Sequence, residues 1–142
     1  MPTGGEARVV RIIDGDTLVV RIGRATERVR LIGVDAPEVA KHGEPGECFG
    51  DDATLVLTGL TPPGSIVRIE RDVEARDVYD RLLAYVTVES DSARVMVNRA
   101  LLEVGAARTL RIEPNTARAS EFESVAATAR SLGVGLWGAC GK

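Results

Sequence analysis

The sequence predicts an α+β, mainly β fold: a five-stranded Greek-key barrel with three helices packed outside it. Two observations lead to this prediction. Five segments alternate apolar and polar residues as half-buried strands do, and three segments carry apolar residues at helical spacing. A closed five-stranded barrel leaves no exposed edge strand, so it is the economical arrangement for these elements.

Short turns join the first three strands into a meander, expected at residues 8–13, 17–22 and 27–32. The dipeptide Asp14-Gly15 is a strong tight-turn signal between the first two strands. In the third strand, Val29 and Leu31 fall on one face and Arg28 and Arg30 on the other. This alternation indicates one buried and one exposed face.

Prolines and glycines mark residues 37–50 as a loop before the first helix. Asp51 and Asp52 favour the start of that helix, and apolar residues follow at helical spacing up to Leu60. Gly105 and Gly133 come where left-handed caps should end the second and third helices. The remaining elements are strands at 65–71 and 82–88 and helices at 97–104 and 122–132.

Length and composition indicate one folded domain over residues 1–142, with 44% hydrophobic and 27% charged residues. The net charge of −3 argues against a tight nucleic-acid binder, but not against an enzyme that contacts a few phosphates. No apolar run approaches the roughly 20 residues that a membrane span needs. The start does not read as a signal peptide, so we expect a cytosolic protein or a trimmed mature form.

The two cysteines, Cys48 and Cys140, allow two interpretations. They are either unrelated buried thiols or a disulfide that joins the C-terminal segment to the middle of the chain. Closing so long a loop would contribute on the order of 4 kcal/mol in the chain-entropy model. A bond would also imply an oxidising compartment.

Three motifs carry the candidate chemistry. Asp-Gly-Asp-Thr stands at 14–17, an arginine followed by Val-Asp-Ala-Pro-Glu spans 30–38, and Tyr-Asp-Arg stands at 79–81. Carboxylates are the hard oxygen ligands that calcium or magnesium requires, and guanidinium forks match a phosphate. Each motif alone also fits a plain turn, a strand end or a surface ion pair. Their combination favours metal-assisted phosphodiester hydrolysis.

In these motifs the sequence resembles the staphylococcal nuclease (thermonuclease) family, from about Val9 to Trp137. A Tyr-x-Arg-x-Leu-Ala-Tyr motif, the helix motif at 96–101 and Gly135-Leu136-Trp137 also occur in the family's order. The resemblance implies the OB-fold form of the five-stranded barrel. We interpret Trp137 as a core residue rather than a base-stacking platform.

The resemblance implies a calcium site and a general base. Asp16 and Asp35 match the family's calcium-ligating carboxylates. Ala36 stands at a position that is commonly threonine and that contributes its backbone carbonyl, which alanine retains. Glu38 matches the glutamate proposed to position or deprotonate the attacking water. The lone histidine, His42, is interpreted as a loop residue because calcium prefers oxygen.

The resemblance also implies a substrate site and an activity. Arg30 and Arg81 match the arginines that hold the scissile phosphate, and Tyr79 matches a nucleotide-contacting tyrosine. The implied activity is calcium-dependent, sugar-nonspecific endonucleolytic hydrolysis of DNA and RNA that leaves 3′-phosphates. We expect a monomer with no membrane partner, secreted or held in the cell envelope. The alternatives are a non-catalytic OB-fold module that binds nucleic acid or peptide, and a structural calcium-binding domain.

Three departures from the family's pattern bear on substrate binding. The loop at 39–52 is acidic where the staphylococcal nuclease is lysine-rich, which should weaken steering of a polyanion. Leu110 and Ile112 replace two further tyrosines, which removes base stacking of about 1–3 kcal/mol per base. Asp80 stands at a glycine position, where it either holds Arg81 in place or partly neutralises it.

Overall fold

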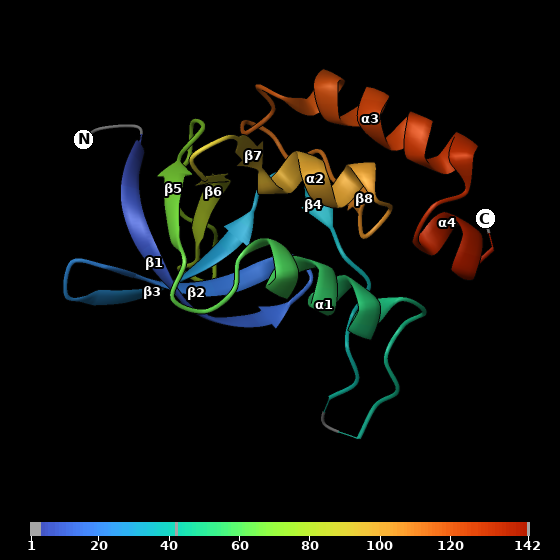
Figure 1. The fold of residues 1–142 in the computed structure, drawn as a ribbon, viewed down its shortest axis with the longest axis horizontal. Coiled ribbons are helices and arrows are strands. Elements are labelled where there is room, and N and C mark those ends of the chain that lie inside the picture. Colours follow the sequence, from blue (N-terminus) through green and yellow to red (C-terminus); the bar gives the residue numbers. More distant parts are fainter. Residues whose placement is uncertain (1–3, 42, 142) are drawn as a thin grey trace.

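Five strands form a closed barrel in the computed structural model, which describes residues 4–41 and 43–141 (Figure 1). Neighbours in the order β3-β2-β1-β5-β6 pair antiparallel, and a parallel pairing of β3 with β6 closes the barrel. The predicted OB-type barrel is therefore confirmed. Its strands are β1 (Gly4–Asp14), β2 (Thr17–Ile22), β3 (Ala25–Leu31), β5 (Ile66–Glu70) and β6 (Leu82–Glu89).

The described part of the chain has three further strands, which are too short to be recognised from alternation in the sequence. β4 (Val34–Asp35) pairs with β8 (Arg108–Thr109), and β7 (Arg94–Met96) pairs with the outer edge of β6. The pairing with β8 positions a candidate site residue, because β4 carries Asp35 directly after the turn that leaves β3.

In the described residues, four helices pack outside the barrel, one more than expected. α1 (Gly50–Leu60), α2 (Val97–Glu103) and α3 (Ala119–Leu132) confirm the prediction, and the four-residue α4 (Leu136–Ala139) was not foreseen. Gly105 and Gly133 adopt the left-handed conformation expected of them, with φ of 73° and 69°. No helix in the described part of the chain is long and apolar enough to cross a membrane.

Asn98 ties α2 to the barrel and is itself fully buried. Its side-chain amide donates to the carbonyls of Ile32 and Ala84, and its Oδ1 accepts from the Val86 N–H. Buried polar groups are stable only when they are paired, and this one is paired at both ends. The bonds to Ile32 and Ala84 hold the end of β3 against β6, close to the candidate site.

A second, smaller core lies where the C-terminal segment meets the middle of the chain. Leu136 and Trp137 form it with Ala129, and Phe49 packs against them. A disulfide joins Cys48 to Cys140 with the Cα atoms 5.8 Å apart, which settles the two open interpretations in favour of the bond. Trp137 is only 8% exposed, as expected for a core residue.

Candidate active site

The β1–β2 hairpin places Asp16 at the end of the barrel. The Asp16 N–H donates to Asp14 Oδ1 at 3.1 Å, which shapes the turn between the strands. Gly15 is required here, because a Cβ at this position would lie 2.6 Å from the Ala36 Cβ and 2.8 Å from the Ala53 Cβ. The hairpin can therefore press directly against β4 and α1.

The carboxylate of Asp16 is buried and held from two sides. Its Oδ1 accepts from the Thr17 hydroxyl at 2.9 Å, and its Oδ2 accepts from the Ala36 N–H at 2.8 Å. Burial and the adjacent Asp16 carboxylate raise the pKa of Asp14 above its ordinary value. The two bonds fix Asp16 beside the peptide that joins Asp35 to Ala36.

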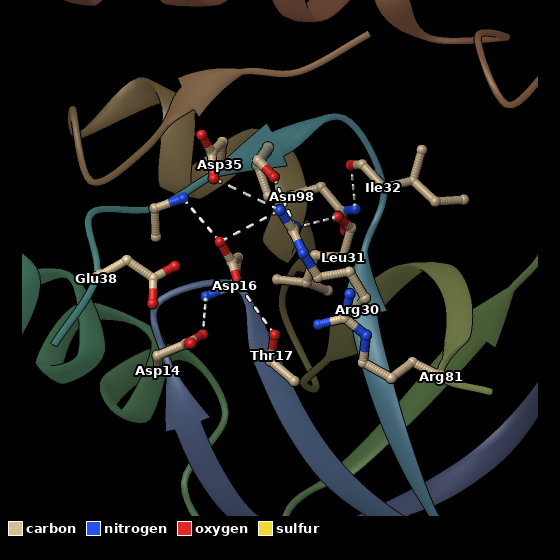
Figure 2. A network of polar contacts seen from close by, with 12 residues as sticks. Asp14, Asp16, Thr17, Arg30, Leu31, Ile32, Asp35, Glu38, Arg81 and Asn98 are labelled. Carbon is tan, nitrogen blue, oxygen red and sulfur yellow. Dashed lines mark hydrogen bonds and ion pairs between the residues drawn. The ribbon is translucent and has the colours of Figure 1, made fainter. Parts of the chain in front are cut away.

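The guanidinium of Arg30 lies between two carboxylates and two main-chain carbonyls (Figure 2). One terminal nitrogen, Nη2, is 3.4 Å from Asp16 Oδ2 and 3.6 Å from Asp35 Oδ1. The other, Nη1, donates to the carbonyls of Leu31 at 3.0 Å and Val34 at 2.7 Å. The shorter bonds go to the main chain, so backbone carbonyls set the position of Arg30.

These residues fit a hard cation. Asp16 and Asp35 converge on one positively charged nitrogen, which shows that their oxygens face a common point. The described residues contain no group of three or more His, Cys, Asp or Glu side chains arranged for a metal. A metal here would therefore rest on the two carboxylates, the Ala36 carbonyl and water, a donor set that suits calcium better than zinc.

Glu38 follows β4 on a loop and lies on the side of the carboxylates in Figure 2. Its side chain is 54% exposed and forms an ion pair with Lys41 at 3.3 Å. Its main chain is held by Glu47: the Glu38 N–H donates to Glu47 Oε1, and the Glu47 N–H donates to the Glu38 carbonyl, both at 2.8 Å. The disulfide at Cys48 follows directly, and His42 lies outside the described residues.

Arg81 is held by Asp77, a residue that sequence reasoning did not single out. Asp77 accepts from the N–H groups of Tyr79 and Arg81 and from Arg81 Nε, at 3.0, 2.9 and 2.8 Å. Burial by itself would raise the pKa of Asp77, but these bonds outweigh it and lower the pKa. The Arg81 guanidinium lies over the Tyr79 ring, with its carbon Cζ 5.3 Å from the ring centroid.

Asp80, directly before Arg81, forms its ion pair with another arginine. Its backbone is left-handed with φ of 65°, which explains why glycine suits the position. Its side chain is 85% exposed and lies 3.5 Å from Arg76, which also pairs with Glu27. The side chain that holds Arg81 is therefore that of Asp77, while the Asp80 side chain pairs with Arg76.

A pocket of about 600 Å³ brings the substrate-binding candidates together. Arg30, Arg81 and Tyr79 line it, and so do Leu110 and Ile112, at the positions where the family's tyrosines are replaced. Asp16, Asp35 and Glu38 lie outside this lining. Arg30 alone belongs to both groups, since it contacts the carboxylates and also lines the pocket.

Sequence reasoning missed Asp77 and Glu47. Their roles depend on bonds to main-chain N–H groups in loops, which leave no hydrophobic pattern. One signal was available: an aspartate two residues before Tyr79 is the spacing of a side chain that caps a turn. No comparable local signal marked Glu47, because its partner lies nine residues away.

Comparisons with known proteins identify the family to which this chain is similar. The family model described as "Staphylococcal nuclease homologue" matches residues 28–139. The chain is 34% identical to a thermonuclease of Staphylococcus hyicus and 36% identical to one of Staphylococcus intermedius. These alignments cover 92% and 94% of this chain and 74% and 77% of the relatives. A micrococcal nuclease of Shigella flexneri is 34% identical, over 91% of this chain and 71% of its own length.

Proposed function

The chain belongs to the staphylococcal nuclease family, and from that premise we propose that it is a calcium-dependent, sugar-nonspecific endonuclease. Its substrates are DNA and RNA. The reaction breaks the bond from phosphorus to the 5′ oxygen and leaves a 3′-phosphate. Membership of this family supports a nuclease. The residues of the site support the assignment of calcium, of both nucleic acids as substrates and of the 3′-phosphate product.

One observation carries the proposal. Arg30 contacts both candidate metal carboxylates and also lines the pocket that contains Arg81 and Tyr79. A phosphate bound by Arg30 in this pocket would therefore lie next to the carboxylates. Phosphoryl transfer depends on positioning and charge stabilisation. A residue that contacts the carboxylates and also lines the phosphate-binding pocket is therefore the central requirement.

The two arginines bind and orient the scissile phosphate. Arg81 uses Nε for Asp77, which leaves its terminal nitrogens without a hydrogen-bond partner among the described residues. A guanidinium fork offers paired donors to phosphate oxygens and keeps its charge at neutral pH. Tyr79, 67% exposed beside Arg81, contacts the nucleotide.

Glu38 acts as the general base that positions or deprotonates the attacking water. Its exposed carboxylate is open to solvent, while Glu47 holds its backbone. Asp16, Asp35 and the Ala36 carbonyl hold the calcium ion. When bound, calcium supplies a positive charge that stabilises the negative charge developing on the phosphate.

The disulfide supports secretion or a place in the cell envelope, because such bonds persist in oxidising compartments. We also propose that the protein acts as a monomer. Light scattering of the oxidised protein at several concentrations measures this directly.

Digestion of single-stranded DNA and of RNA tests the proposal. Each substrate is incubated with calcium and with excess chelator, beside Glu38→Gln and the matched loop variant Glu44→Gln. We expect calcium-dependent cutting that falls at least about 100-fold in Glu38→Gln and stays near wild type in Glu44→Gln. Products should accept 3′ extension only after phosphatase treatment, which identifies the 3′-phosphate.

Folded wild-type protein that binds single-stranded DNA but cuts nothing in millimolar calcium would favour the non-catalytic binding module. Cutting that persists in chelator would contradict the calcium assignment alone. Equal losses in Glu38→Gln and Glu44→Gln would contradict the role of Glu38. Calorimetric titration of calcium into Asp16→Asn checks the metal site without relying on activity.

A further inference from the structure

Four arginines share the outer face of the β1–β2–β3 meander. In the strand register Arg8 lies opposite Arg21, and Arg11 and Arg28 each lie opposite Val19. Residues directly opposite in an antiparallel pair project to the same side, and so do alternate residues along one strand. All four arginines are exposed, and we call them the arginine face: Arg8, Arg11, Arg21 and Arg28.

The arginine face is continuous with the candidate active site. Arg30 comes two residues after Arg28 on β3, about 6.6 Å further along the strand, and projects to the same side. The Arg28 guanidinium donates to the Tyr79 carbonyl at 3.0 Å. A nucleic-acid strand leaving Arg30 and Tyr79 would therefore pass directly onto these arginines.

This face keeps a net positive charge, although Glu6, two residues before Arg8 on β1, is exposed on the same side. None of the ion pairs formed within residues 4–41 and 43–141 involves any of the four. Arg8 and Arg28 donate instead to main-chain carbonyls, of Gly64 and Tyr79. Like charges directly opposite in a sheet are destabilising, so Arg8 opposite Arg21 lowers stability unless an anion lies between them.

A cluster of glutamates lies in the segment that precedes α1. Figure 1 shows the β2–β3 hairpin extending from one side of the barrel. The residues at 38–41 and 43–49, which include three glutamates, extend from another side. A chain of net charge −3 therefore has one distinctly positive face. Such separation attracts a polyanion to the positive side and orients it before contact.

We propose that the arginine face is an exosite that binds the phosphodiester backbone of the substrate strand outside the active site. This inference rests on the proposed nuclease function. Residues 4–31 include no aromatic side chain, so recognition goes through phosphates rather than stacked bases. The exosite offsets the weak steering expected of the acidic loop and favours long strands over short oligonucleotides.

The test compares two double variants that each remove two positive charges. Arg11→Gln/Arg21→Gln removes half of the arginine face without touching Arg28 or the active site. Arg94→Gln/Arg99→Gln is the control, because these arginines lie on β7 and α2, outside the meander. They form ion pairs with glutamates of β6, α2 and α3. Circular-dichroism melting shows whether each variant folds. If a double variant does not fold, the single variants Arg21→Gln and Arg94→Gln replace the two double variants in the same comparison.

Binding is measured by fluorescence anisotropy with a labelled single-stranded DNA of about 30 nucleotides in chelator, across a salt series. Arg11→Gln/Arg21→Gln should bind about tenfold more weakly, with a salt slope smaller by about 1.4, and the control should match wild type. In calcium, the double variant should lose cleavage of the long strand through a higher KM. Cleavage of a trinucleotide should stay unchanged.

Equal binding by the two double variants would overturn the exosite, and so would equal losses on the long strand and the trinucleotide. Wild-type protein that binds through these arginines but cuts neither substrate would support the exosite and contradict the proposed nuclease. Wild-type protein that cuts both, with the arginine variant indistinguishable from the control, would overturn the exosite alone.

Discussion

The two halves of the candidate site are held in different ways. Arg30 belongs to a barrel strand, and main-chain carbonyls fix its position. Glu38 and Arg81 lie in loops, and each is held by one acidic side chain, Glu47 and Asp77. In both loops the carboxylate accepts hydrogen bonds from main-chain N–H groups, which in a strand or helix would be paired with main-chain carbonyls.

This contrast explains part of the acidic composition near a site for a polyanion. A carboxylate can accept several hydrogen bonds and so fix an irregular backbone, but it adds negative charge close to the substrate. Glu47 is one of the loop acids expected to weaken substrate attraction, and the structure gives it a positioning role. The loop half of the site therefore depends more on single residues than the barrel half does.

Removing the disulfide should have the largest effect, and it should fall on the loop half. Cys48→Ser/Cys140→Ser opens a loop with a sequence separation of 92 residues, and we expect a loss of about 4 kcal/mol in the free energy of unfolding. Denaturant unfolding measures this, and reduced wild-type protein is the matched control. Stability within about 1 kcal/mol of the oxidised protein would show that the C-terminal core, not the bond, holds this segment.

Lysine substitutions at the two arginines sharpen the comparison. Arg30→Lys and Arg81→Lys keep the charge but lose the fork, so we expect kcat/KM to fall about 100-fold in each. Arg94→Lys, at a side chain 73% exposed, should change little. Near-normal activity in Arg81→Lys beside a large loss in Arg30→Lys would show that the loop arginine acts only as a point charge.

Substitution of Asp77 tests whether one acid holds the loop arginine. Asp77→Asn should lower kcat/KM about tenfold through a misplaced Arg81, whereas Asp80→Asn, three residues on and mostly exposed, should stay near wild type. Equal effects of the two substitutions would mean that loop charge, not positioning, matters.

The lowered pKa of Asp77 predicts that the stability difference between wild type and Asp77→Asn depends on pH. The folded-state pKa of Asp77 lies below its ordinary value, so its ionised form stabilises the folded protein above that ordinary value. The contribution is lost as the pH falls through the lowered folded-state pKa. The difference in unfolding free energy between wild type and Asp77→Asn should be constant near neutrality and shrink in acid, as urea titrations at several pH values would show.

Much of the barrel could be predicted because its strands and helices are regular and amphipathic. β4, β8 and α4 could not, since two to four residues carry no periodic signal and exist only through tertiary pairing. The family motifs named the candidate site residues, and the structure brings Asp16, Asp35 and Arg30 into contact. The support behind Glu38 depends on loop geometry that no pattern in the sequence encodes. The support behind Arg81 left one local signal, the aspartate two residues before Tyr79.

The parallel pairing of β3 with β6 links assembly of the site to folding as a whole. Arg30 pairs with Leu83, two residues after Arg81, so the arginines meet only when segments some fifty residues apart close the barrel. Partial opening of the Glu38 segment can leave this contact intact, whereas separating the arginines requires the barrel itself to open. Amide hydrogens around Arg30 should therefore exchange only through global unfolding, while those around Glu38 should exchange through smaller, more frequent openings.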